Sequence, residues 1–169
     1  MKIKLAILFT IIMLTDVSYV LCQEAEITTF ILIRHAEKVD DSSDPDLSSE
    51  GYQRAERLNS MFNKAEIDAI YSTDLNRTRE TVRVLAKSKD LEIAYYDVQT
   101  PVKTANQWIT EHRGEVIIVS GHSNTTPVFA NALLGRQHFS GSFDESDYGN
   151  LLIITLSETG NSKLLHLRY

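Results

Sequence analysis

The chain contains one cysteine, Cys22, so no disulfide can form within it and its fold must depend on packing. Positive charge is also scarce, because 17 lysines and arginines against 23 aspartates and glutamates give a net charge of −6. This balance excludes the general basic surface that nucleic-acid-binding proteins present. Any anion site must therefore be a local cluster of arginines in an acidic background.

Long apolar runs are absent as well. The longest run, residues 5–14, falls well short of the roughly 20 residues that a membrane-spanning helix needs, so we predict no membrane span. It follows the basic Lys2 and Lys4, and Asp16 comes soon after it. This order of charge and apolarity is typical of a secretory signal peptide. We therefore predict a signal peptide over residues 1–22 and export, to the periplasm or out of the cell.

The single cysteine lies near the expected processing point. Bacterial lipidation requires a small residue immediately before the cysteine, whereas Leu21 precedes Cys22 here. We therefore expect a soluble mature form, and a lipid anchor on Cys22 is the less favoured alternative.

The rest of the chain has the composition of one globular domain. The sequence is 43% hydrophobic and 24% charged, which suits a self-sufficient core, and it has no internal repeat, low-complexity tract or linker. We therefore predict one domain over residues 23–169.

Strand and helix patterns alternate along this domain. Helical spacing of apolar residues predicts helices from Ser48 or Ser49 to Phe62, after a cap at Asp74, and over 102–112 and 124–134. Short β-rich runs predict the strands 28–33, 67–71, 91–95, 116–119, 151–156 and 163–167. Such alternation predicts an α/β fold, a three-layer α/β/α sandwich with a mostly parallel central sheet.

Two predicted strands end in a histidine. His35 follows the first strand between Arg34 and Glu37, and His122 follows the apolar strand 116–119. Ligands of open α/β sheets bind beyond the carboxyl ends of the strands, so both imidazoles can face one pocket. Either histidine alone would more often be an ordinary loop residue.

A third segment, residues 71–81, runs from a strand end into the first turn of a helix and carries Arg77. Arg77 therefore begins close to the same sheet edge. Its planar, permanently charged guanidinium is suited to a phosphate, although a solvated surface charge is the ordinary role of such a residue.

These segments, in this order, resemble the histidine phosphatase (phosphoglycerate mutase-like) superfamily. The family's Arg-His-Gly-Glu motif is matched with Ala36 in place of glycine, and its Gly-His-Ser motif is matched at residues 121–123. Residues 72–81 resemble its Ser-x-Leu-x-Arg-Ala-x-x-Thr segment with one extra residue, and residues 47–55 resemble its Leu-Thr-x-x-Gly helix start. The resemblance covers essentially all of residues 27–169.

The resemblance implies a phosphatase that uses neither a metal nor another cofactor, and the N-terminal pattern described above predicts that it is exported. His35 would be the nucleophile and transient phosphate carrier, and Arg34, Arg77, His122 and Ser123 would bind the phosphoryl oxygens. Phosphoryl transfer consists mostly of positioning and charge stabilisation, which two guanidiniums and a second imidazole can supply. The implied substrates are phosphomonoesters or phosphoramidates, on a small molecule or on a protein side chain.

The proton donor for the leaving group is not evident from the sequence. Larger family members carry a carboxylate after the third strand, in a segment that this chain lacks. Asp97 lies nearest to that position and is the first candidate, although an ordinary polar residue at a strand end is the slightly favoured interpretation. Glu37 and Asp147 are the other candidates.

Three other interpretations compete with hydrolysis. A non-catalytic periplasmic module could bind phosphate or another anion without turnover. A phosphoglycerate-type mutase would need a closed pocket and insertions, for which the chain has little length. A two-histidine metal site lacks close carboxylate or histidine partners and would be opposed by the arginines. His112, His138 and His166 enter none of these schemes.

Overall fold

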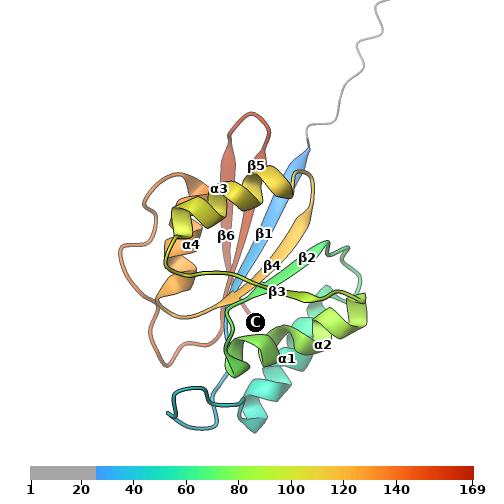
Figure 1. Ribbon diagram of the computed structural model, residues 1–169, viewed down its shortest axis with the longest axis vertical. Coiled ribbons are helices and arrows are strands. Elements are labelled where there is room, and N and C mark those ends of the chain that lie inside the picture. The colour runs from blue at the N-terminus through green and yellow to red at the C-terminus, as the bar shows by residue number, and fades with distance from the viewer. Residues whose placement is uncertain (1–25) are drawn as a thin grey trace, which may run out of the picture.

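The computed structural model describes residues 26–169, so the predicted signal peptide (1–22) and Cys22 lie outside the described residues. Six strands form one sheet in the order β3-β2-β4-β1-β5-β6 (Figure 1). The strands β1 to β4 run parallel to one another, and β5 is antiparallel to both of its neighbours, β1 and β6. Their bounds are β1 Ile27–Arg34, β2 Ala69–Ser72, β3 Ile93–Tyr95, β4 Val116–Gly121, β5 Asn150–Ser157 and β6 Ser162–Arg168.

Helices cover both faces of this sheet, which confirms the predicted three-layer α/β/α sandwich. The helices α1 and α2 pack on one face, and α3 and α4 pack on the other (Figure 1). Their bounds are α1 Ser49–Phe62, α2 Asn76–Lys89, α3 Pro101–Glu111 and α4 Thr125–Leu134.

The central strands explain why the sequence has continuous apolar runs. In β4, Ile117 and Val119 face α3 and α4, whereas Ile118 between them faces α1 and α2. Both faces of a central strand are therefore buried, as the unbroken run 116–119 predicts. The neighbouring β1 alternates in the same way, with Phe30 on one face and Ile31 on the other.

The structure confirms the predicted start of α1. The Ser48 hydroxyl accepts a hydrogen bond from the Gly51 amide (3.2 Å) and begins α1, and α4 ends at Gly135 in the left-handed region (φ 64°). The predicted cap at Asp74 is wrong. Its carboxylate pairs with Arg79 instead, and α2 begins after Leu75 without a side-chain cap.

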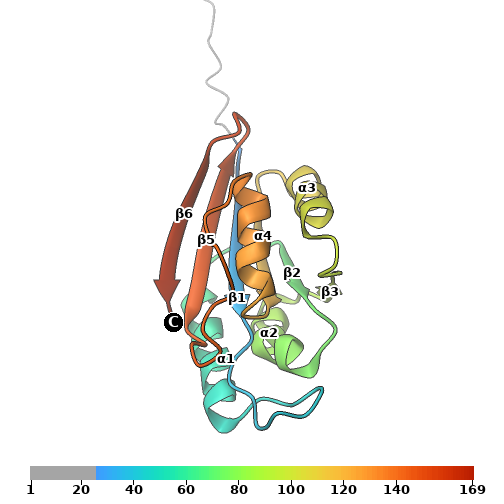
Figure 2. The same cartoon turned by 90° about the vertical axis from the view of Figure 1, so that its left-hand side faces the viewer.

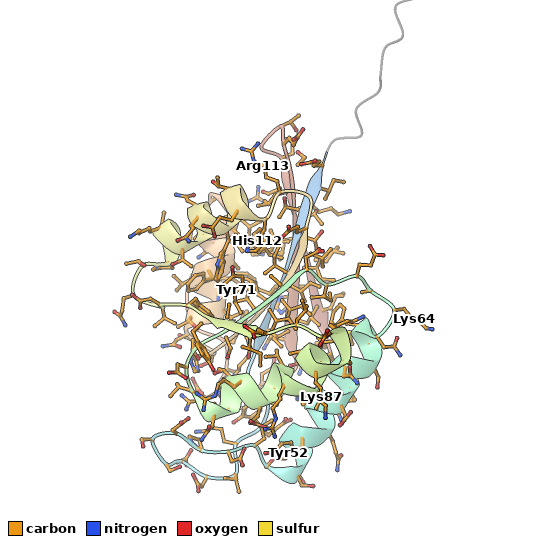
Figure 3. The ribbon with its side chains drawn as sticks, turned by 45° about the vertical axis from the view of Figure 1, so that its right-hand side comes forward. Tyr52, Lys64, Tyr71, Lys87, His112 and Arg113 are labelled. Atoms are coloured by element: carbon orange, nitrogen blue, oxygen red, sulfur yellow. The ribbon has the colours of Figure 1, made fainter. Side chains whose placement is uncertain are left out.

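His112 ties the end of α3 to the sheet, beside Tyr71 of β2 (Figure 3). The Tyr71 hydroxyl lies 2.8 Å from Nε2 of His112, whose Nδ1 contacts the Glu115 carboxylate at 2.5 Å. This contact lies where β4 begins, at the opposite end of the strand from His122.

Among residues 26–169, no helix is long and apolar enough to cross a membrane.

Candidate active site

The two strand-end histidines emerge side by side. The strands β1 and β4 are parallel neighbours with Arg34 opposite Gly121, so the next residue of each is a histidine at the same sheet edge. The His35 amide donates to the Gly121 carbonyl (2.8 Å), and the imidazole centroids of His35 and His122 are 5.4 Å apart in an edge-to-face arrangement. The structure thus brings both candidate imidazoles together.

The hydrogen bonding of His35 fixes its tautomer. Its Nδ1 lies 2.8 Å from the Ala36 carbonyl oxygen. A carbonyl oxygen can only accept, so Nδ1 carries the proton and Nε2 keeps its lone pair. Burial, together with the positive charges of Arg34 and Arg77, lowers the pKa of His35 to about 3. The imidazole is therefore neutral at physiological pH, with Nε2 able to act as a nucleophile.

A cavity of about 350 Å³ opens over these imidazoles. Its wall is mostly polar and combines two basic side chains with two histidines and one carboxylate. The lining residues are His35, Lys38, Arg77, Val98, His122, Ser123, Asn124, Thr125 and Glu145. Arg77 comes from the first turn of α2. Its buried Nε has no hydrogen-bond partner among the described residues. A buried guanidinium donor without a partner favours an anionic ligand.

His122 presents one ring nitrogen to this cavity. Its Nε2 lies 3.0 Å from the Thr73 hydroxyl, so Nδ1 is the nitrogen left for a ligand. Burial, with Arg77 and Arg34 nearby, lowers the pKa of His122 to about 4. Two neutral imidazoles and a guanidinium therefore surround the same space.

Arg34 lies behind the cavity wall and is fully buried. Its Nη1 donates to the carbonyl oxygens of Asp144 (2.9 Å) and Asp147 (3.2 Å), and its Nη2 donates to the Glu145 carboxylate (2.8 Å). The guanidinium also stacks on the Tyr148 ring at 4.1 Å. Arg34 is thus held by the loop before β5. Glu145 of that loop contacts Arg34 and also lines the cavity, whereas Arg34 itself does not line it.

A threonine connects the nucleophile's segment to α2. The Thr81 hydroxyl accepts from the Ala36 amide (2.8 Å) and donates to the Arg77 carbonyl (2.7 Å). The residue after His35 and the helix turn that carries Arg77 therefore share one hydroxyl. This contact fixes the relative position of the two candidate groups.

The three carboxylates that the sequence offered as proton donors do not line the cavity. The Glu37 carboxylate forms an ion pair with Arg54 (2.6 Å), which lowers the pKa of Glu37 although burial opposes this. Asp97 turns to the Gln99 amide (2.8 Å) and lines a separate cavity beside α3. Asp147 pairs with Arg168 at 2.8 Å.

Glu145 is the residue that the sequence interpretation missed. It lines the cavity and accepts hydrogen bonds from Ser123 and Arg34. The sequence signal for it is the acidic segment 144–147 shortly before β5; the structure adds that β5 is antiparallel and begins at the edge where β1 ends (Figure 2). Within residues 26–169, no three histidine, cysteine or acidic side chains gather in a way that could hold a metal ion.

Parts of the chain are similar to known proteins. Residues 30–98 match the family model of the histidine phosphatase superfamily (branch 1). A stretch of 74 residues is 36% identical to phosphoserine phosphatase 1 of Hydrogenobacter thermophilus (strain DSM 6534 / IAM 12695 / TK-6). That match covers 40% of this chain and 35% of the relative, so the chain matches only about a third of that protein's length.

Solved structures share the fold across nearly the whole described chain. Bacillus stearothermophilus YhfR superposes with a TM-score of 0.67 at 18% identity, over 82% of this chain and 96% of that one. The protein histidine phosphatase SixA, solved with tungstate, gives a TM-score of 0.64 at 16% identity, over 83% and 96%. At these identities the likeness concerns the fold.

Proposed function

Because the chain belongs to the histidine phosphatase superfamily, we propose that it hydrolyses phosphomonoesters or phosphoramidates without a metal ion, through a phosphohistidine on His35. The observation that carries this proposal is the orientation of that imidazole. Its Nδ1 proton is held by the Ala36 carbonyl at 2.8 Å, which leaves a neutral Nε2 in the same cavity as Arg77, whose buried Nε has no hydrogen-bond partner among the described residues. Phosphoryl transfer to histidine requires a neutral imidazole next to a hydrogen-bond donor that can bind the phosphoryl oxygens.

The reaction takes two steps. First, Nε2 of His35 attacks phosphorus, the Nε2–P bond forms, and the bond from phosphorus to the leaving oxygen or nitrogen breaks as that atom gains a proton. Second, water attacks the phosphohistidine, the Nε2–P bond breaks, and inorganic phosphate leaves. In both steps the phosphoryl oxygens carry developing charge, which Arg77 and His122 are placed to stabilise.

The names of two matched proteins suggest which leaving groups the substrate could carry. Two of the matched proteins are named a phosphoserine phosphatase and a protein histidine phosphatase, which represent the ester and the phosphoramidate class. We therefore propose that a small phosphoester or a phosphorylated protein side chain is the substrate.

The test is phosphate release by the purified full-length chain. We expect turnover of aryl phosphates and of a phosphohistidine peptide, unchanged by EDTA, and almost none by His35→Ala. Phosphate binding without release would instead indicate an anion-binding module, and phosphoryl transfer between two hydroxyls would indicate a mutase. Loss of activity in EDTA that a divalent metal restores would overturn metal independence.

We also propose that the protein is exported, on the basis of the basic and apolar pattern of residues 1–22. Cell fractionation with mass spectrometry of the mature N-terminus tests this. We expect an unmodified N-terminus after cleavage. A diacylglyceryl group on Cys22 would show a lipoprotein instead, and an uncleaved cytoplasmic chain would refute export.

A further inference from the structure

Glu145 has the position of a catalytic acid. It belongs to the loop between α4 and β5. The strand β5 begins at the edge of the sheet where β1 ends (Figure 2). Of the described residues that line the cavity, it carries the only carboxylate. The three carboxylates that the sequence offered have other partners: Glu37 pairs with Arg54, Asp97 accepts from the Gln99 amide, and Asp147 pairs with Arg168.

Two contacts place the Glu145 carboxylate between the reactive segments. One oxygen accepts a hydrogen bond from the Ser123 hydroxyl, and the other accepts from Nη2 of Arg34 at 2.8 Å. Ser123 directly follows His122, and Arg34 directly precedes His35. The carboxylate is therefore fixed by the immediate neighbours of both imidazoles.

The exposure of the His35 and Glu145 side chains indicates which way the leaving atom points from phosphorus. The His35 side chain lies on the cavity floor, with the residue 4% exposed, whereas the Glu145 side chain is 76% exposed and lies at the mouth. In phosphoryl transfer the attacking and leaving atoms are roughly in line through phosphorus. With Nε2 on the floor, the leaving atom points to the mouth, where Glu145 stands.

From this arrangement we propose that Glu145 is the general acid and base of the phosphatase reaction, a role that rests on the function proposed above. As the Nε2–P bond forms and the P–O bond breaks, the Glu145 carboxyl donates its proton to the leaving oxygen. In the second step the resulting carboxylate takes a proton from the attacking water, whose oxygen bonds to phosphorus as Nε2 leaves. The carboxyl group is thereby restored.

The experiment compares Glu145→Gln with wild type on two substrates that differ in the leaving group. An alkyl phosphate needs a proton on its leaving oxygen, whereas 4-nitrophenyl phosphate does not. We expect kcat for the alkyl phosphate to fall by roughly a hundredfold or more, the usual size of a general-acid effect, with little change for 4-nitrophenyl phosphate.

Glu158→Gln is the matched control, because Glu158 is an exposed glutamate just after β5 ends, at the other end of that strand. It should leave both substrates unaffected. An equal loss on both substrates in Glu145→Gln would mean that Glu145 only positions Arg34, and no loss on either would mean that it has no role. Both results overturn the proposal. A wild type that is inert with 4-nitrophenyl phosphate would instead refute the phosphatase function itself.

Discussion

Gly51 and Glu37 are packed so closely that a side chain at Gly51 has no room. A Cβ atom at Gly51 would lie 2.3 Å from the Glu37 carbonyl oxygen. The same oxygen accepts a hydrogen bond from the Ser48 amide at 2.9 Å. The start of α1 is thus built against the chain two residues after His35, and it supports the segment that holds the nucleophile.

Gly51→Ala should therefore destabilise the fold, because a backbone oxygen cannot move aside as a flexible side chain can. We expect a loss of about 1–3 kcal/mol in the free energy of unfolding, the range for overpacked sites, measured by urea denaturation. Gly141→Ala is the control, since nothing lies within 4 Å of its Cβ position. Equal stability of the two variants would show that the contact is not restrictive.

Stability should fall in mild acid because of the buried imidazoles. Burial lowers the pKa of His35 to about 3. Below pH 6.5 the unfolded chain therefore binds a proton that the native state does not, and native stability is lost progressively from about pH 6.5 to 3. In His35→Gln, the loss of unfolding free energy between pH 7.5 and pH 5 should be smaller by about 2 kcal/mol.

Urea denaturation at the two pH values measures this difference. His138→Gln, at an exposed loop position, should keep the wild-type loss. If His35→Gln loses as much stability as the wild type between pH 7.5 and pH 5, then His35 is not held neutral in the native state.

Removal of the Arg77 guanidinium from the cavity wall should affect catalysis and not folding. Arg77→Ala should lower kcat/KM for an aryl phosphate by about 10²–10³-fold, the cost of one preorganised donor in a transition state. Arg79→Ala is the matched control on the same helix, because Arg79 pairs with Asp74 and lies off the cavity wall. Steady-state kinetics should give nearly the wild-type kcat/KM for Arg79→Ala. Equal effects of the two substitutions would argue that Arg77 acts through helix stability.

Much of the fold could be predicted because its signals are local. The apolar run 116–119 required burial on both faces, and β4 is a central strand. Helical spacing at Ala55, Leu58 and Phe62 gave the inner face of α1. The juxtaposition of His35 and His122 followed from parallel strands that end at one edge.

The remaining features depend on contacts between distant segments. Glu145 reaches the cavity only because β5 runs antiparallel to β1, a direction that strand patterns do not reveal. Glu37 belongs to the motif that carries the nucleophile, yet its carboxylate pairs with Arg54 of α1 and does not line the cavity. Arg34 likewise contacts residues more than 100 positions later in the chain.

The most direct test of the account is the detection of phosphate on His35. The full-length protein is incubated briefly with an aryl phosphate, quenched in alkali and mapped by peptide mass spectrometry. The free Nε2 of His35 predicts one acid-labile, base-stable phosphoryl group on that residue, absent from His35→Ala together with the activity. Turnover by His35→Ala close to the wild-type rate, or a phosphoryl group on another residue, would contradict the account.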